Sequence, residues 1–196
     1  PKVRAGVSVD TKRIAIVGHS AGGGGVLNAA AHEACDRVAA VVSLNPSHPS
    51  VEQPGDHMAE CKKFFEGANF SGEYGEGVIP HLAKIKAPTL LYGTLTEYNT
   101  EMSFKPGCCF HWPVYPCTFE QIGAAKKELY VDNVAKLDHK GSNLLAHMWL
   151  SEQSTLETYA GGVPLKVICS FLRRHCKGSD EAPPEPENAH EWKVVG

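Results

Sequence analysis

The sequence predicts an α/β fold, with a mostly parallel sheet flanked by helices. Short segments with apolar stretches of strand length recur at residues 13–17, 37–44, 89–93 and 127–131, and the first of them is rich in β-branched residues. The first two runs enclose a helical segment, and a strand–helix–strand unit of this length makes its two strands parallel. The chain has 196 residues and 42% hydrophobic content, which is enough for one domain with a buried core.

The first strand–helix–strand unit is the best-defined part of the sequence. Residues 13–17 (Arg-Ile-Ala-Ile-Val) predict a buried strand that stops at Gly18. Residues 22–34 predict a helix whose many small side chains allow it to press closely against a sheet. Residues 37–44 predict the second strand, which Asn45-Pro46 closes.

The pattern loosens at residues 47–86, where prolines and glycines interrupt it. Two short helices are predicted inside this segment, at 59–65 and 78–85. Such a long connection between core strands is either a functional excursion, such as a lid or pocket wall, or a decorative insertion.

The second half of the chain predicts two more strands and a closing helix. Strand 89–93 leads into a loop rich in Cys, Pro and aromatic residues (98–116), and a helix is expected at 119–126. Strand 127–131 follows. An amphipathic helix is predicted at 156–174, with Pro164 in its first turns.

The C-terminal residues 177–196 are acidic and Pro-rich, which predicts a disordered or loosely docked tail. We therefore expect residues 1–176 to belong to the folded domain. No internal repeats are found.

A Gly-x-Ser-x-Gly pattern occupies residues 18–22, between the first strand and its helix. A serine in so sharp a turn has strained backbone dihedrals, and we expect glycine at both flanking positions to let the turn close. The Ser20 hydroxyl would project above the sheet, and the backbone N–H of Ala21 would face a developing oxyanion, aided by the helix dipole. The pattern therefore predicts Ser20 as a nucleophile, with His19 lining the substrate pocket.

A serine nucleophile needs a base, and the base needs an orienting carboxylate. In α/β-hydrolases the three follow in the order Ser, acid, His, with acid and base at the carboxyl ends of later strands. Glu97 lies in the loop after the third predicted strand, and His139 lies in the loop after the fourth. The predicted catalytic residues are therefore Ser20, His139 and Glu97.

Other titratable residues compete for the roles of base and acid. His147 is the main alternative base, although it falls in a predicted helical stretch. The alternative acids are three carboxylates near the predicted acid or base, namely Glu101, Asp132 and Asp138. Further histidines lie on predicted helices or in the cysteine-rich loop, at His32, His81 and His111.

Residues 9–25, from Val-Asp-Thr through the run of glycines, resemble the serine-turn region of bacterial cutinases and polyester (PET) hydrolases. Residues 89–97 are similar to the strand that delivers the catalytic Asp of that family, with Glu97 at the position of the Asp. His139, followed four residues later by Asn143, resembles the family's catalytic His. The resemblance runs with gaps from about residue 8 to residue 175. It implies an α/β-hydrolase that cleaves carboxylic esters through an acyl-enzyme and needs no cofactor.

The chain departs from this family pattern at several positions, so the resemblance does not define which ester is cleaved. The acid is Glu instead of Asp, and Ala21 stands where Met is common. The family's aromatic residue against the acyl chain has no obvious counterpart; His48 is the nearest residue and a predicted pocket residue. Residues 41–46 and the later Cys/Pro loop are faintly similar to chlorophyllases, which carry an Asp where Asn45 stands. Polyester, lipid, chlorophyll and small esters are all candidate substrates.

Charge and cysteine content narrow the function classes. The formal net charge of −3, with scattered basic residues, gives no patch for nucleic acid or an anionic membrane, and no apolar run has the length of a transmembrane span. The seven cysteines form no C-x-x-C pair and nearby histidines lack zinc-ligand spacing, so no metal site is expected. The same count slightly favours a secreted or organellar, oxidising compartment, with buried reduced thiols as the alternative.

The α/β-hydrolase resemblance implies further strands before the one that carries the nucleophile. Strand 13–17 taken alone would be an exposed hydrophobic edge, which folded proteins avoid. We therefore expect residues 1–176 to be the C-terminal portion of such a domain, with the edge covered by an N-terminal half or by a partner chain. Two functions follow: an active serine esterase, or a non-catalytic hydrolase-like subunit of a larger assembly, because fold does not fix function.

Overall fold

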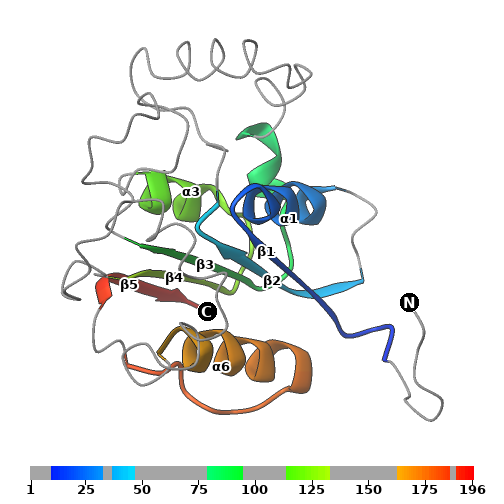
Figure 1. Cartoon of the computed structure of the whole chain (residues 1–196). Helices are drawn as coiled ribbons and strands as arrows, with labels where there is room; N and C mark the ends of the chain where they lie inside the picture. The colour runs from blue at the N-terminus through cyan, green and yellow to red at the C-terminus, as the bar shows by residue number, and fades with distance from the viewer. Residues whose placement is uncertain (1–9, 33–36, 47–78, 95–113, 133–162, 186–188) are drawn as a thin grey trace.

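The structure, a computed structural model, describes residues 10–32, 37–46, 79–94, 114–132, 163–185 and 189–196. These residues form a five-stranded sheet in the order β1-β2-β3-β4-β5, with helices on both of its faces (Figure 1). Neighbouring strands from β1 to β4 are parallel, and β5 runs antiparallel to β4. The predicted α/β class, with a mostly parallel sheet flanked by helices, is confirmed.

The four predicted strands are all present, and each ends within two residues of its predicted bounds. Their apolar runs are continuous instead of alternating because helices cover both faces of the parallel part of the sheet. The five strands of the sheet are β1 (Ile14–His19), β2 (Val38–Leu44), β3 (Thr89–Thr94), β4 (Lys127–Asp132) and β5 (Ala189–Val195).

The helices depart from their predicted bounds more than the strands do. The described helical segments are α1 (Ala21–Ala31), the 3₁₀ helix η2 (Ile79–Lys84), α3 (Val114–Gln121) and α6 (Val163–Lys177). Helix α3 starts and ends five residues before the predicted helix 119–126. The early end is explained by the turn at Gly123, whose N–H donates to the Leu82 carbonyl and where a β-carbon would stand 2.0 Å from the Ala83 carbonyl oxygen.

Two further helix predictions are tested only in part. Pro164 is the second residue of α6, as expected for a proline in the first turn of a helix. The predicted residues of that helix before Val163 lie outside the described part of the chain, as does the predicted helix at 59–65.

The prediction of a disordered or loosely docked tail is wrong for the last residues. Residues 189–195 form β5, and Trp192 pairs with Tyr130 across the antiparallel ladder. Polar and apolar residues alternate within β5 itself, a pattern that suits an edge strand. The acidic, Pro-rich stretch before β5 makes this pattern hard to recognise in the sequence. Lys193 carries the polar side, with its Nζ 2.9 Å from the Glu191 carboxylate and 3.8 Å from that of Glu120 on α3.

The core has two layers, one on each face of the sheet. The layer under α1, η2 and α3 is built from large buried side chains, among them Leu27, Leu82, Phe119 and Leu129. The layer under α6 contains Tyr92, Tyr130 and Phe171, and the two tyrosine rings are stacked with their centroids 4.8 Å apart.

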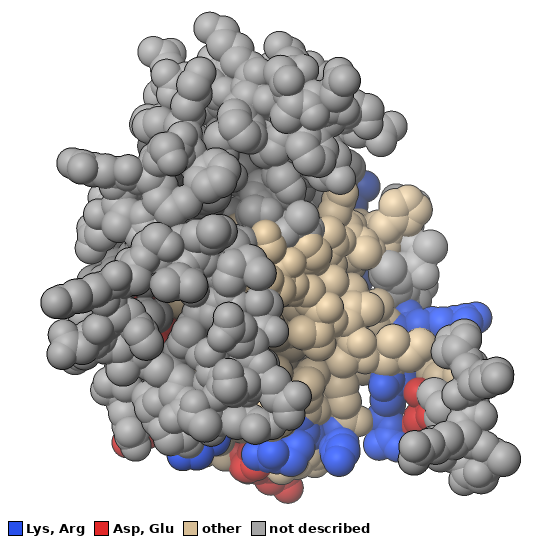
Figure 2. Space-filling view, in the orientation of Figure 1, with Lys and Arg blue, Asp and Glu red and all other residues tan. Residues whose placement is uncertain are grey.

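Strand β1 lies at the edge of the described sheet and exposes apolar side chains. Ile14 is 40% exposed and Val17 is 50% exposed. Figure 2 shows uncharged surface over the region of β1 and α1, bordered by basic side chains. The predicted exposed hydrophobic edge at this strand is confirmed.

Candidate active site

Ser20 connects β1 to α1 in a strained backbone conformation. Its φ is 57° and its ψ is −124°, and it occupies the N-cap position of α1. Residues other than glycine rarely adopt positive φ, and such strain persists only where the surroundings enforce it. The strain predicted for this turn is confirmed.

Steric crowding enforces the turn, but not at both predicted glycines. A β-carbon on Gly18 would stand 2.0 Å from the carbonyl oxygen of Gly22, so only glycine fits there. A β-carbon on Gly22 would meet nothing within 4 Å, and the expectation that the turn needs glycine there is wrong. The second crowded position is Gly23, where a β-carbon would stand 2.9 Å from the Leu44 carbonyl oxygen and from Cα of Pro46.

Hydrogen bonds join the Ser20 turn to the end of β2. The Ser20 N–H donates to the Leu44 carbonyl at 3.0 Å. The Ser20 carbonyl accepts the N–H groups of Gly23 at 2.8 Å and Gly24 at 3.2 Å, which starts α1. The buried Ser43 hydroxyl on β2 donates to the Gly23 carbonyl at 3.0 Å. The turn therefore has fixed partners on both its strand and helix sides.

The carboxyl ends of the other parallel strands bring polar residues to the same edge of the sheet. Asn45 follows β2 with a φ of 37°, is fully buried, and donates its N–H to the Tyr92 carbonyl at 2.8 Å. Asp132, fully buried at the end of β4, accepts the Tyr92 hydroxyl at 3.0 Å. Ligand sites of open α/β sheets lie at this edge. A serine nucleophile at Ser20 would therefore stand where such a fold presents its chemistry.

The predicted site residues divide into two groups. Ser20 and the backbone of Ala21 form the β1–α1 turn, and His19 is the last residue of β1, half-buried beside Ser20. Glu97, His139 and His48 lie outside the described residues, and so do the alternatives Glu101, Asp138 and His147.

Sequence reasoning missed the contributions of Ser43 and Gly23 to this turn. The signal for Ser43 is a single hydroxyl inside the apolar run of β2 (Val-Ala-Ala-Val-Val-Ser-Leu), where a buried polar group must find a partner. The signal for Gly23 is weaker, because four glycines follow each other at residues 22–25 and only the structure separates them.

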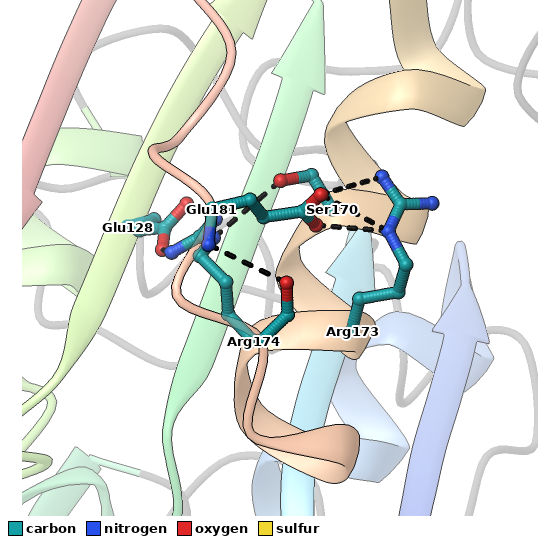
Figure 3. Close-up of polar contacts among 6 residues, drawn as sticks. Glu128, Ser170, Arg173, Arg174 and Glu181 are labelled. Atoms are coloured by element: carbon teal, nitrogen blue, oxygen red, sulfur yellow. Dashed lines mark hydrogen bonds and ion pairs between the residues drawn. The ribbon is translucent and has the colours of Figure 1, made fainter.

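A second polar cluster joins α6 to β4 (Figure 3), on the face of the sheet opposite α1 (Figure 1). Arg174 makes a two-bond contact with the buried Glu128 carboxylate, at 2.5 and 2.9 Å, and His175 Nε2 lies 3.7 Å from the same carboxylate. Burial raises the pKa of Glu128, but His175 and Arg174 outweigh it, so the net pKa is lowered. The neighbouring pair of Arg173 and Glu181, 2.9 Å apart, is much more exposed.

Within the described ranges, no three His, Cys, Asp or Glu side chains gather in a way that could hold a metal ion. Among the helices described, none is long and apolar enough to cross a membrane.

Comparison with known proteins reveals a likeness of fold. No protein-family model and no curated protein sequence matches the chain. An acylaminoacyl peptidase from Pyrococcus horikoshii has a similar structure, with a TM-score of 0.52 at 19% identity, over 89% of this chain and 26% of that one. Together with the sheet order, this similarity places the chain in the α/β-hydrolase fold class.

Two other hydrolase structures are similar at lower TM-scores. An esterase from Pyrococcus furiosus has a TM-score of 0.46 at 15% identity, over 84% of this chain and 54% of that one. A 2,6-dihydroxy-pseudo-oxynicotine hydrolase has a TM-score of 0.48 at 19% identity, over 93% of this chain and 45% of that one. The chain spans between 26% and 54% of the length of these three proteins.

Proposed function

We propose that the chain carries the nucleophile of a serine hydrolase that cleaves carboxylic esters. The observation that supports this most is the strained backbone of Ser20 between β1 and α1. Backbone strain of this kind clusters at functional sites. Around Ser20, the close backbone packing leaves no room for a side chain at Gly18 or Gly23. Ser20 is the N-cap residue of α1, and the dipole of a helix stabilises negative charge near its N-terminus.

In the proposed mechanism, the Ser20 hydroxyl attacks the ester carbonyl while His139 takes its proton. Glu97 orients His139 and stabilises its charged form. The Ala21 N–H holds the oxyanion, and the alcohol leaves with the proton returned by His139. Water then attacks the acyl-enzyme and releases the acid and free Ser20. The reaction needs no cofactor.

The proposed substrate class follows from the cutinase and polyester-hydrolase resemblance. His19 and His48 are proposed to line the acyl pocket. Asp132, one of the alternative acids, is fully buried at the end of β4, and its carboxylate accepts the Tyr92 hydroxyl. Glu97, in the loop after β3, stays the proposed acid, because the acid of this fold precedes the histidine in the chain and follows an earlier strand.

The exposed edge of β1 supports a further part of the proposal. We propose that another strand, from the same polypeptide or from a partner chain, pairs with β1 and covers Ile14 and Val17. A second oxyanion donor would come from that added segment. The same exposed edge supports the competing proposal, a non-catalytic subunit whose β1 docks into a larger assembly.

Covalent labelling with a fluorophosphonate probe, read by peptide mass spectrometry, separates the two proposals. An esterase is labelled at Ser20, and Ser20→Ala abolishes labelling. His139→Ala slows labelling by orders of magnitude, whereas the matched variant His147→Ala does not; Glu97→Gln and Glu101→Gln form the corresponding pair for the acid. An unlabelled Ser20 in the folded chain, with the segment that covers β1 present, would favour the non-catalytic subunit.

A further inference from the structure

The buried hydroxyl of Ser43 lies beside the start of α1. Its hydrogen-bond partner, Gly23, is in the first turn of that helix, next to Ser20. Ser43 is fully buried on β2, in register with Gly18 of β1. Its Oγ donates to the Gly23 carbonyl at 3.0 Å. A carbonyl inside a helix has a second lone pair that can accept such a bond. This bond is therefore an added tie between β2 and the first turn of α1.

Two short paths connect β2 with the backbone of Ser20. One is direct, from the Leu44 carbonyl to the Ser20 N–H at 3.0 Å. The other runs from the Ser43 hydroxyl to the Gly23 carbonyl, and from the Gly23 N–H to the Ser20 carbonyl at 2.8 Å. Both peptide groups that flank the strained residue are thus held by adjacent residues of β2.

The absence of a side chain at Gly23 makes the second path possible. The Gly23 α-carbon packs so tightly on the end of β2 that a β-carbon would lie 2.9 Å from the Leu44 carbonyl and from Pro46. A close approach of backbones with a buried hydroxyl between them leaves little room for α1 to shift. Ser20 requires such a hold, because a non-glycine residue leaves a positive φ when its surroundings relax.

We propose that Ser43 is a positioning residue for the Ser20 nucleophile. This inference rests on the proposed function. Ser43 does not touch the substrate; its hydroxyl fixes the first turn of α1 against β2, and with it the direction of the Ser20 hydroxyl and the Ala21 N–H. A merely structural hydrogen bond would contribute to stability without affecting the reactivity of the folded protein.

The test compares Ser43→Ala with Thr89→Val in the full chain. Thr89 is an equally buried hydroxyl at the opposite end of the sheet, and its Oγ1 donates to the Ala87 carbonyl at 2.9 Å. Each variant therefore removes one buried hydroxyl and one hydrogen bond. The readouts are the second-order rate constant for fluorophosphonate labelling of Ser20 and the exchange rate of the Gly23 amide. Circular dichroism checks that each variant is folded.

We expect Ser43→Ala to slow labelling by about tenfold, because small misplacements of a nucleophile are costly. The Gly23 amide should exchange faster in the same variant, and Thr89→Val should change neither readout. Ser43→Cys, which keeps a weak donor, should fall between wild type and Ser43→Ala. With a soluble ester substrate, the loss should appear in kcat with KM unchanged.

Equal labelling of wild type, Ser43→Ala and Thr89→Val would overturn the inference and leave the proposed function intact. Equal slowing in Ser43→Ala and Thr89→Val would also overturn it, because the effect would then follow stability. Should Ser43→Ala fail to fold, Ser43→Cys decides the question by the same comparison. A wild-type chain that is not labelled even when the segment that covers β1 is present would reject the proposed function itself.

Discussion

The carbonyl oxygen of Gly22 lies 2.0 Å from the point that a β-carbon on Gly18 would occupy, whereas Gly22 has open space at its own β-carbon position. Gly18→Ala should therefore destabilise the protein by about 3 kcal/mol or more, because backbone must move to admit the methyl group. Gly22→Ala should stabilise it by up to about 1 kcal/mol, since alanine is the better helix residue. Urea unfolding measures both, and a similar loss in the two variants would contradict the described turn.

Strain at Ser20 predicts a difference between two variants that both remove the hydroxyl. Ser20→Gly relieves the steric strain of the positive φ of 57°, because glycine adopts such angles freely, whereas Ser20→Ala keeps that strain. The glycine variant should be more stable than the alanine variant by about 1 kcal/mol, because relief of strain exceeds the added entropy of the unfolded chain. Thermal unfolding of the pair is the measurement. An alanine variant at least as stable as the glycine variant would argue against strain.

Two adjacent arginines on α6 should differ sharply in their contribution to stability. Arg174→Met leaves the buried carboxylate of Glu128 without its main partner, which should cost about 3 kcal/mol. Arg173→Met removes the more exposed pair with Glu181, which water screens, and should cost much less than Arg174→Met. Chemical denaturation of the two variants checks the ranking, which would be refuted if Arg173→Met were the more damaging.

The lowered pKa of Glu128 predicts loss of stability in acid. Although its burial acts to raise the pKa, the neighbouring His175 and Arg174 bring it below the ordinary value of 4.5. The ionised carboxylate therefore stabilises the fold fully above that value, and this contribution is lost as the pH falls through the lowered pKa. Unfolding free energies between about pH 7 and pH 3 should drop less steeply for Glu128→Gln than for wild type. An unchanged slope would exclude this carboxylate as the source.

Exposed apolar side chains on β1 predict self-association at that edge. Val17→Lys should reduce concentration-dependent association, because a lysine on an edge strand disfavours pairing with another chain. Leu165→Lys, at a comparably exposed apolar position on α6, serves as the control and should have little effect. Analytical ultracentrifugation across a range of concentrations measures both. Equal behaviour of Val17→Lys and wild type would mean that the β1 edge does not associate.

The strands were predictable because burial on both faces of a parallel sheet leaves continuous apolar runs in the sequence. Strand β5 was not, since an acidic, Pro-rich stretch precedes it and its alternation of Trp192 and Val194 with charged residues is short. The early end of α3 also escaped prediction, because it depends on the packing of Gly123 against η2, a contact between distant parts of the chain.

The candidate site was predictable only where a local pattern defines it. The Gly-x-Ser-x-Gly run located the turn and its strain, because both depend on consecutive residues. It could not distinguish the glycine that the turn needs from the one that it does not, since Gly22 and Gly23 differ only in what lies opposite them on β2. The hydrogen bond from Ser43 to the first turn of α1 is likewise a tertiary contact. The proposed acid and base stay predictions.

The order of the described strands in the sheet is the same as their order in the chain. Each strand from β2 onward can therefore be added to an open edge during synthesis, and none has to be inserted between two strands that are already paired. In such an order of assembly, the turn at Ser20 would acquire its partners on β2 at the first of these additions. The proposed nucleophile would thus be set in place early, while the sheet is still growing at its other edge.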